Sequence, residues 1–455
     1  MNIVFISPIS FDNSGGAHRP VQFAQEFARR GHTVTYLEIE KSRAPVSGSN
    51  PRVLTLDALG WDELNIVRAW YGFDYTSPAD VGETFQRNVS TGHDERGIVI
   101  CSAPFRPALE LLPPLAARGY ALVYDVLDDI SEMRALGSYC YDDLAEQYLA
   151  QYSDLIVTLS PRLTEKFRAH KNAVMIRDGV DLTPFRAPPS GTERTPLRSF
   201  VDGNAAASRS AAASVPYTLA RGELTIGFWG TMWEYNLDVP LLQTITRARP
   251  AWQWHFIGAY DLDPARPSLA KQLAAPNVHF HPSVAREVLA RYAQSFDVCI
   301  LPTPVTPFNL ARDPLKVYEY LACYKPVVAT HLEQLADMPH VYLARDAEEF
   351  LQHIERAARE PLDRTPLDAY LNAQTWMKRT DALIDAIQNL NPTLRPPPPP
   401  RGAMPNAHSE LDRWRAFARH LELIVQDREA HIHDLENALA QSSIANKVKR
   451  LLLSR

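Results

Sequence analysis

The chain has 455 residues and a mass of 51.2 kDa, with 45% apolar and 22% charged residues. That length allows about three domains, and the composition is that of an ordinary folded protein. The 47 basic and 53 acidic side chains give a formal net charge of −6. Because coating a nucleic acid requires a basic surface, this charge argues against a nucleic-acid partner.

Cysteine usage and hydropathy indicate the compartment. The four cysteines are far apart and fit neither a zinc motif nor a disulfide framework, which favours reduced thiols in a cytoplasm. No apolar run approaches the roughly 20 residues that span a bilayer, and the N-terminus lacks the basic region of a signal peptide. We therefore expect a cytoplasmic protein.

Two breaks in composition divide the chain. Segment 188–214 is rich in Ser, Ala, Gly and Pro, and it has too little apolar surface to offset its ordering entropy, so a flexible insertion is predicted. The run Pro396–Pro400 must be extended polyproline II. These breaks predict an N-terminal domain, a linker, a second domain, a proline-rich linker and a helical tail, over residues 1–186, 187–221, 222–390, 391–404 and 405–455.

The first block alternates strand and helix patterns. Asn2–Ser7 is apolar and predicts a buried strand, and the helix after it begins near Pro20 and ends at Gly31. Further strands are predicted over His32–Ile39, Ile98–Cys101, Ala121–Val126, Leu155–Leu159 and Ala173–Ile176. Alternation of this kind predicts a parallel sheet with helices on both faces.

The second block repeats the pattern. Thr225–Trp229 predicts a strand that ends at Gly230, and Asp238 is expected to cap the next helix. The remaining elements are strands at Trp252–Ile257, Asp297–Leu301 and Pro326–Ala329, and helices at Val284–Gln294, Leu315–Cys323 and Pro366–Leu390, the last with Thr365 as N-cap. The predicted fold is α/β, with two tandem Rossmann-like doubly wound domains and a ligand in the crevice at their strand ends.

Two patterns suit a phosphorylated ligand. Gly15 and Gly16 lie between the first strand and helix, where backbone N–H groups and the helix dipole attract anions; an ordinary tight turn explains them equally well. Lys316 and Glu319 are three residues apart and share a helix face. A cation suits a phosphate and a carboxylate suits a ribose diol, whereas an exposed ion pair is the simpler interpretation of this spacing alone.

Two further polar positions are predicted near the crevice. His18 begins the first helix and either contacts the acceptor or sugar or serves as a surface or capping residue. Asp128 and Asp129 follow a predicted strand and suit Mg²⁺, an acceptor base or a helix cap. We predict that Asp128 lines the crevice and that no metal is bound.

Four parts of the chain resemble the group 1 (family 4-like) glycosyltransferases of the GT-B fold. They are Gly15-Gly16 with Phe23–Leu37, Ser153–Arg162 with Ile176–Phe185, Thr225–Gly230 with Phe256–Gly258, and Phe296–Pro302 with Pro314–Val328. The resemblance spans about residues 1–390 and is most specific in the last part. It implies that the helix at Pro366–Leu390 crosses back to the first domain.

The resemblance also implies a donor site. Glu319 matches the glutamate that holds the ribose of the nucleotide sugar, and Lys316 matches the lysine that binds the diphosphate. The family's other glutamate, which orients the transferred sugar, falls on Ala311, so either Arg312 or Asp313 replaces it or the sugar is held in another way. Donor binding is expected to include Gly15, Gly16 and Gly230 as well.

The implied function is that of a retaining, metal-independent hexosyltransferase. It would use a nucleotide sugar as substrate, with no further cofactor, and a glycan or lipid-linked acceptor, with His18 and Asp128 as the candidate catalytic residues. Surface polysaccharide synthesis is the expected setting. A GT-B sugar-nucleotide epimerase and a catalytically silent GT-B scaffold are the two alternatives.

The tail shows a coiled-coil pattern. Trp414 to Leu439 are linked by alternating steps of four and three residues, and Arg428 is the one charged position on this seam. Self-association through 411–442 is predicted; a single helix packed on the core is the alternative. The last ten residues mix basic side chains with leucines, which fits either a peripheral contact with the inner face of an anionic membrane or a solvated helix end.

Overall fold

The computed structural model describes residues 1–11, 18–39, 50–70, 76–78, 85, 97–102, 104–133, 142–186, 219–220, 222–233, 236–261, 267–390 and 418. Gly15 and Gly16, nearly all of the linker 187–221, the proline-rich segment and, save one residue, the tail lie outside these ranges. The predictions made for those parts therefore stay predictions. Within the described part of the chain, no helix combines the length and the apolar character needed to cross a membrane.

The first domain is built on a seven-stranded parallel sheet in the order β3-β2-β1-β4-β5-β6-β7. Its strands are β1 (Asn2–Ser7), β2 (Thr33–Glu38), β3 (Arg52–Thr55), β4 (Gly97–Cys101), β5 (Ala121–Asp125), β6 (Leu155–Thr158) and β7 (Ala173–Met175). In the central strand β1 every residue is buried, as expected for a strand covered on both faces.

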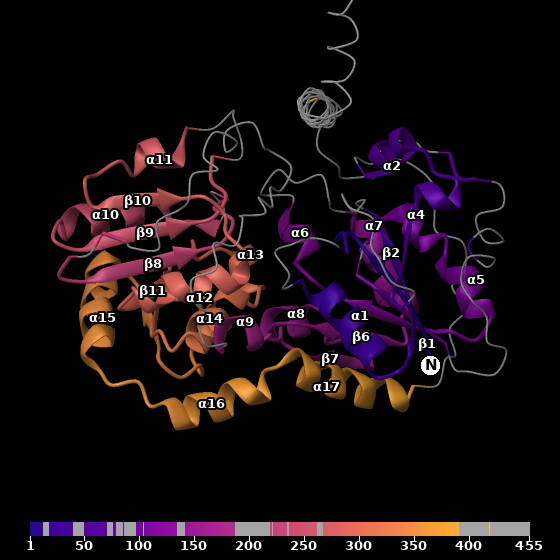
Figure 1. The fold of residues 1–455 in the computed structure, drawn as a ribbon. Helices are drawn as coiled ribbons and strands as arrows, with labels where there is room; N and C mark the ends of the chain where they lie inside the picture. The colour runs from indigo at the N-terminus through magenta and orange to yellow at the C-terminus, as the bar shows by residue number, and fades with distance from the viewer. Residues whose placement is uncertain are drawn as a thin grey trace, which may run out of the picture.

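Helices cover both faces of this sheet (Figure 1). They are α1 (Arg19–Arg29), α2 (Glu63–Trp70), α4 (Arg106–Leu109), α5 (Leu112–Ala117), α6 (Ile130–Met133), α7 (Asp143–Tyr152) and α8 (Pro161–Lys166). The short helix α9 (Thr183–Arg186) packs instead on the second domain, where Phe185 joins the hydrophobic core. Phe23 and Phe27 of α1 belong to one hydrophobic core, and Leu112 and Leu149 of α5 and α7 belong to the other. The α1 helix ends as predicted, with Gly31 at φ +80°.

The second domain repeats this architecture with six parallel strands in the order β10-β9-β8-β11-β12-β13. The strands are β8 (Thr225–Trp229), β9 (Gln253–Ile257), β10 (Val278–His281), β11 (Val298–Leu301), β12 (Val327–Thr330) and β13 (Val341–Ala344). The helices are α10 (Val239–Ala248), α11 (Leu269–Gln272), α12 (Arg286–Gln294), α13 (Pro307–Leu310), α14 (Leu315–Ala322) and α15 (Ala347–Arg359). The predicted fold class, two doubly wound α/β domains in tandem, is confirmed.

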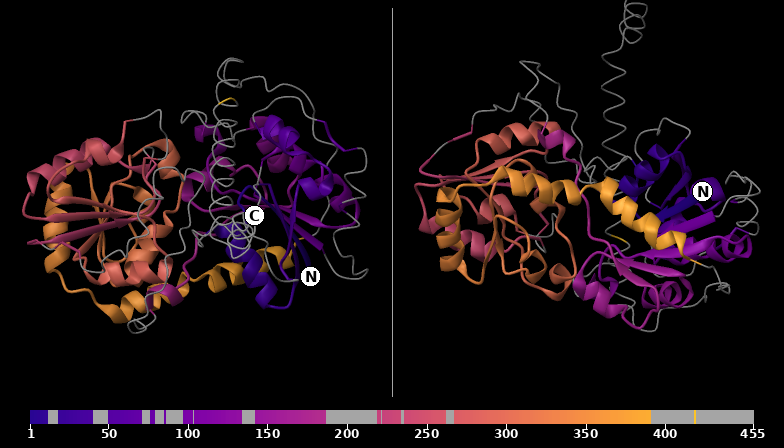
Figure 2. Two further views of the ribbon diagram at one scale, coloured as in Figure 1. Left: turned by 45° about the horizontal axis from the view of Figure 1, so that its top comes forward. Right: turned by 90° about the horizontal axis from the view of Figure 1, so that it is seen from below.

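The end of the core crosses from the second domain back to the first (Figures 1 and 2). The single helix predicted over 366–390 is wrong, because two helices, α16 (Arg364–Ala373) and α17 (Trp376–Gln388), meet at Thr375. The Thr375 side chain caps α17 by accepting from the Lys378 N–H. Asp363, rather than Thr365, caps α16, since its carboxylate accepts from the Thr365 N–H at 3.1 Å.

Helix α17 packs on α1. The Trp376 ring meets Phe23 edge to face at 5.5 Å between centroids, and Arg30 donates to Asp381 at 2.7 Å. Leu383 and Ile387 enter the same core as Phe23. The last helix of the core therefore completes the first domain, although it follows the second in sequence.

Candidate donor site between the domains

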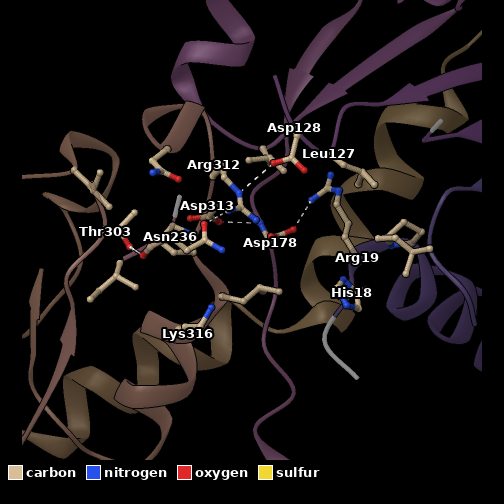
Figure 3. Close-up of a pocket in the computed structure, with 18 of the residues that line it drawn as sticks. His18, Arg19, Leu127, Asp128, Asp178, Asn236, Thr303, Arg312, Asp313 and Lys316 are labelled. Carbon is tan, nitrogen blue, oxygen red and sulfur yellow. Dashed lines mark hydrogen bonds and ion pairs between the residues drawn. The ribbon is translucent and has the colours of Figure 1, made fainter. Parts of the chain in front are cut away.

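A cavity of about 260 Å³ lies between the two domains (Figure 3). The first domain lines it with His18, Arg19, Leu127, Asp128 and Asp178, and the second with residues that include Asn236, Thr303, Arg312, Asp313 and Lys316. Most of these polar residues follow a strand or begin a helix, as expected for a crevice at the carboxyl ends of parallel strands. Of the predicted site residues that the structure describes, five line this cavity directly.

Lys316 lies in the first turn of α14, and its side chain is only partly exposed. Among the described residues its ammonium forms no hydrogen bond or ion pair; the Phe228 ring lies 5.9 Å away. Burial and the nearby Arg312 lower the pKa of Lys316 to about 8, although Glu319 opposes this shift. An unpaired ammonium at a helix N-terminus is a site for an anion.

Gly230 is what leaves room for Lys316. It has φ +129°, and a Cβ built there would lie 2.1 Å from Lys316 Cε and 3.0 Å from Nζ. The glycine therefore lets the lysine stem pass directly over the end of β8. This contact places Gly230 beside the cavity.

Arg312 joins the two domains across the cavity. Its Nε lies 3.1 Å from Asp128 Oδ1, and its Nη1 donates to Asn236 Oδ1 at 2.9 Å. Burial raises the pKa of Asp128, while Arg312 opposes the rise. Asp128 therefore lines the cavity and holds a cation of the opposite domain.

The two neighbouring aspartates point to different partners. Asp129 accepts from Lys166 at 2.7 Å and from Ser131 at 2.6 Å, away from the Arg312 contact of Asp128. In the described parts of the chain, no three His, Cys, Asp or Glu side chains gather in a way that could hold a metal ion.

Asp313 is a structural link between the domains. Its carboxylate accepts from Arg177 Nη2 at 2.6 Å, from the Asp178 N–H at 2.9 Å and from the Tyr318 hydroxyl at 3.0 Å. Because three donors already engage this buried carboxylate, its first role is to hold segment 177–178 against α14.

Ala311 is fully buried and packs into a core of the first domain. Its carbonyl accepts from Ser160 Oγ at 2.6 Å. The position that carries a glutamate in the resembling family therefore faces the first domain, whereas its neighbours Arg312 and Asp313 line the cavity.

Glu319 lies one helical turn beyond Lys316 and is 9% exposed. Its Oε2 accepts from Trp229 Nε1 at 2.9 Å, and its Oε1 accepts from Arg286 Nη2 at 2.9 Å. The simple Lys316–Glu319 ion pair considered from spacing is not formed. Glu319 lies next to the cavity lining rather than within it.

The first domain contributes a buried charge cluster that sequence reasoning missed. Arg19 donates to Asp125 at 2.8 Å and to Asp178 at 3.4 Å, and its Nη2 has no partner among the described residues. Burial, with Asp313 and Asp125 nearby, raises the pKa of Asp178 to about 7, against the opposing effect of Arg19. The one available signal was the place of Arg19 next to His18 at the start of α1.

Comparisons with known proteins agree with this architecture. Residues 223–360 match the family model described as Glycosyl transferases group 1. A protein of Bacillus subtilis (strain 168), provisionally named teichuronic acid biosynthesis glycosyltransferase TuaH, is 27% identical over 205 residues, which is 44% of this chain and 46% of the relative. The matched region thus spans about half the length of that curated relative.

Solved structures share the whole two-domain arrangement. Sucrose-phosphate synthase from Thermosynechococcus elongatus has a TM-score of 0.57 at 16% identity, over 85% of this chain and 98% of that one. Anabaena HepE in complex with UDP and glucose also has a TM-score of 0.57 at 13% identity, over 85% of this chain and 99% of that one. The resemblance to group 1 glycosyltransferases and the GT-B fold are both confirmed.

Proposed function

We propose that this protein is a glycosyltransferase that moves a sugar from a nucleotide-sugar donor to an acceptor hydroxyl, with retention of the anomeric configuration and without a metal ion. The observation that carries the proposal is the Lys316 ammonium at the start of α14, which has no hydrogen-bond or ion-pair partner in the described part of the chain and lines one cavity together with His18 and Asp128 of the first domain. The group 1 family match over the second domain supports it.

The leaving group decides where cations are needed. As the sugar–phosphate bond breaks, negative charge builds on the diphosphate and positive charge on the sugar ring. Lys316 and the N-terminus of α14 would stabilise the diphosphate. Their charges are fixed before the substrate arrives, so little reorganisation is needed in the transition state.

The acceptor would be held by the first domain. Asp128 faces the cavity and has a raised pKa, so it can accept a hydrogen bond, and then a proton, from an acceptor hydroxyl. His18 also lines this cavity and would contact the sugar or the acceptor. Arg312 would release Asp128 or share it with the hydroxyl.

The substrates are proposed from the relatives. HepE was solved with UDP and glucose, so UDP-sugars are the first donors to test. The Bacillus relative is named for teichuronic acid biosynthesis, which supports a glycan or lipid-linked acceptor in surface polysaccharide synthesis. Contact with such an acceptor fits a cytoplasmic protein that works at the inner face of a membrane.

The test has two stages. Thermal unfolding across ADP, CDP, GDP, UDP and their sugars identifies the donor, since a ligand specific for the native state raises the melting temperature. Release of the nucleoside diphosphate is then measured with and without EDTA, for wild type, Lys316→Met and the exposed control Lys271→Met. We expect turnover in EDTA, loss of about tenfold or more in Lys316→Met, and no change in the control.

Each other outcome has a definite meaning. Binding without turnover would favour the silent scaffold. Turnover that is lost in EDTA and restored by Mg²⁺ would contradict the metal-independent mechanism. If no nucleotide binds, the donor site itself is wrong.

A further inference from the structure

The Glu319 carboxylate is held by donors from two different elements. Trp229 lies at the end of β8, and Arg286 is the first residue of α12. Each donates to a different carboxylate oxygen at 2.9 Å. Two donors on two oxygens fix both the position of the carboxylate and its rotation.

Both donors are themselves held in place. The Trp229 indole meets the Tyr320 ring edge to face at 4.3 Å, and the Tyr320 hydroxyl lies 3.2 Å from the Trp229 backbone nitrogen. The Arg286 guanidinium lies 5.2 Å from the centroid of the Phe185 ring, which belongs to α9. The side chains of Arg286 and Glu319 are only 15% and 11% exposed.

This arrangement leaves capacity for a ligand. A carboxylate accepts about four hydrogen bonds, and the described residues donate two to Glu319. The two that remain match the two hydroxyls of a ribose. Glu319 also follows Lys316 by about one turn of α14, roughly 4.5 Å along the axis, so that one ligand can reach both side chains.

Resting on the proposed function, we propose that Arg286 is the positioning residue of the donor site: it orients Glu319 toward the ribose diol and balances its charge. Without Arg286, a buried carboxylate would lose its cation and one of its two fixed donors, which is costly in a poorly hydrated site. It would then turn or take up water. Discrimination between ribose and deoxyribose would be lost together with affinity.

The experiment compares two ligands on several variants. Binding of the nucleoside diphosphate that stabilises wild type, chosen from ADP, CDP, GDP and UDP, is measured by calorimetry against its 2′-deoxy form. The variants are Arg286→Met, Glu319→Gln and a matched control, Arg249→Met, which removes the arginine of a 3.0 Å ion pair with Glu355 elsewhere in the second domain.

Wild type and the Arg249→Met control should favour the ribonucleotide by about tenfold or more, the effect of one charge-assisted hydrogen bond. In Arg286→Met the affinity for the ribonucleotide should fall by a similar factor. The ratio of ribonucleotide affinity to deoxyribonucleotide affinity should then fall toward one. A folded Arg286→Met that keeps the wild-type ratio overturns the proposal. Should Arg286→Met fail to fold, Arg286→Gln takes its place, because it keeps most of the side chain and a donor but no charge. A ratio that falls toward one would support the proposal, and a wild-type ratio would overturn it.

The result also separates this inference from the proposed function. If Glu319→Gln loses discrimination and Arg286→Met does not, Glu319 holds the ribose without help from Arg286. If Glu319→Gln keeps full discrimination, the ribose lies elsewhere, and the assignment of Glu319 fails along with the inference.

Discussion

Single residues in the cavity act through the space and charge around them. Lys316 is the clearest case, because its position depends on a glycine 86 positions earlier in the chain, and its pKa depends on burial and on the nearby Arg312. Both dependencies can be tested by one substitution or one change of pH.

The Gly230→Ala variant should displace Lys316. Its Cβ would lie 2.1 Å from Lys316 Cε, and φ +129° is unfavourable for alanine. We expect nucleoside diphosphate affinity to fall about tenfold or more. Gly119→Ala is the matched control, since Gly119 has φ +83° with nothing within 4 Å of its Cβ. The control should lose about 1 kcal/mol of stability and keep its affinity; equal affinities in both variants would contradict the Lys316 assignment.

Donor binding should depend on pH through Lys316. Its pKa of about 8 means that the free protein carries the ammonium below that pH and loses it above. Nucleoside diphosphate affinity should therefore decline as the pH rises from 7 to 9. Lys316→Arg stays charged throughout this range, so its affinity should decline less. The affinities are measured by calorimetric titration at matched ionic strength. If affinity falls equally with pH in wild type and in Lys316→Arg, the result would count against the role of Lys316.

Sequence reasoning could place Lys316 and Glu319 on one helix face, because helix periodicity is local. It could not find Arg286, which reaches Glu319 from α12, or the contact of Asp128 with Arg312, 184 residues away. It also assigned Arg312 and Asp313 to the donor, which stays a prediction, and it did not find that both side chains contact groups of the first domain. Such pairings depend on how the two sheets meet, and no local pattern encodes that.

At the scale of elements, strands β9 and β10 carry a stack of histidines. His255 lies between His279 and His281, with ring centroids at 4.7 and 5.3 Å. Its Nδ1 is 3.0 Å from His281 Nε2, and its Nε2 is 2.9 Å from the Ala220 carbonyl. Burial lowers the pKa of all three, and that of His255 to about 4.

This stack should weaken the protein in mild acid. Between pH 6.5 and 4, His255 binds a proton in the unfolded state but not in the folded state. The free energy of unfolding therefore falls as the pH falls. Asp178 acts in the opposite sense, because its raised pKa makes the folded state take up a proton below pH 7. The free energy of unfolding in urea is therefore measured at pH 7.5 and at pH 5 for wild type and for His255→Gln, and the change between the two pH values is compared. Wild type should lose more stability than the variant, on the order of 2 kcal/mol; equal losses would exclude the stack as the cause.

Elements were predicted best where the sequence is buried on both faces. The bounds of β1 and β8 match the prediction to the residue, since each is a short, continuous apolar run. The strands β3, β10 and β13 were not predicted. All three are edge strands, and their residues are mostly half-buried. The break at Thr375 was missed because helix periodicity continues on both sides of the cap.

For the whole molecule, the crossing helix predicts how truncation behaves. A chain ending at Leu390 keeps Trp376, Leu383 and Ile387 in the core of the first domain, so it should fold and bind the donor. A chain ending at Ala373 loses these side chains and should unfold its first domain, since removing one large core side chain alone costs about 3–5 kcal/mol. Circular dichroism measures the folding of both truncated chains, and nucleotide titration measures their donor binding. A stable, binding chain ending at Ala373 would show that α17 is dispensable.

The order of the chain and the order of the fold differ in a way that matters during synthesis. The core beneath α1 contains Phe23 from the start of the chain and Trp376 and Ile387 from near residue 390. A ribosome must therefore make the second domain before the first can close its own apolar face. Until then the part of this core that α17 covers stays exposed, so we expect the first domain to reach its native state only after the second has been made.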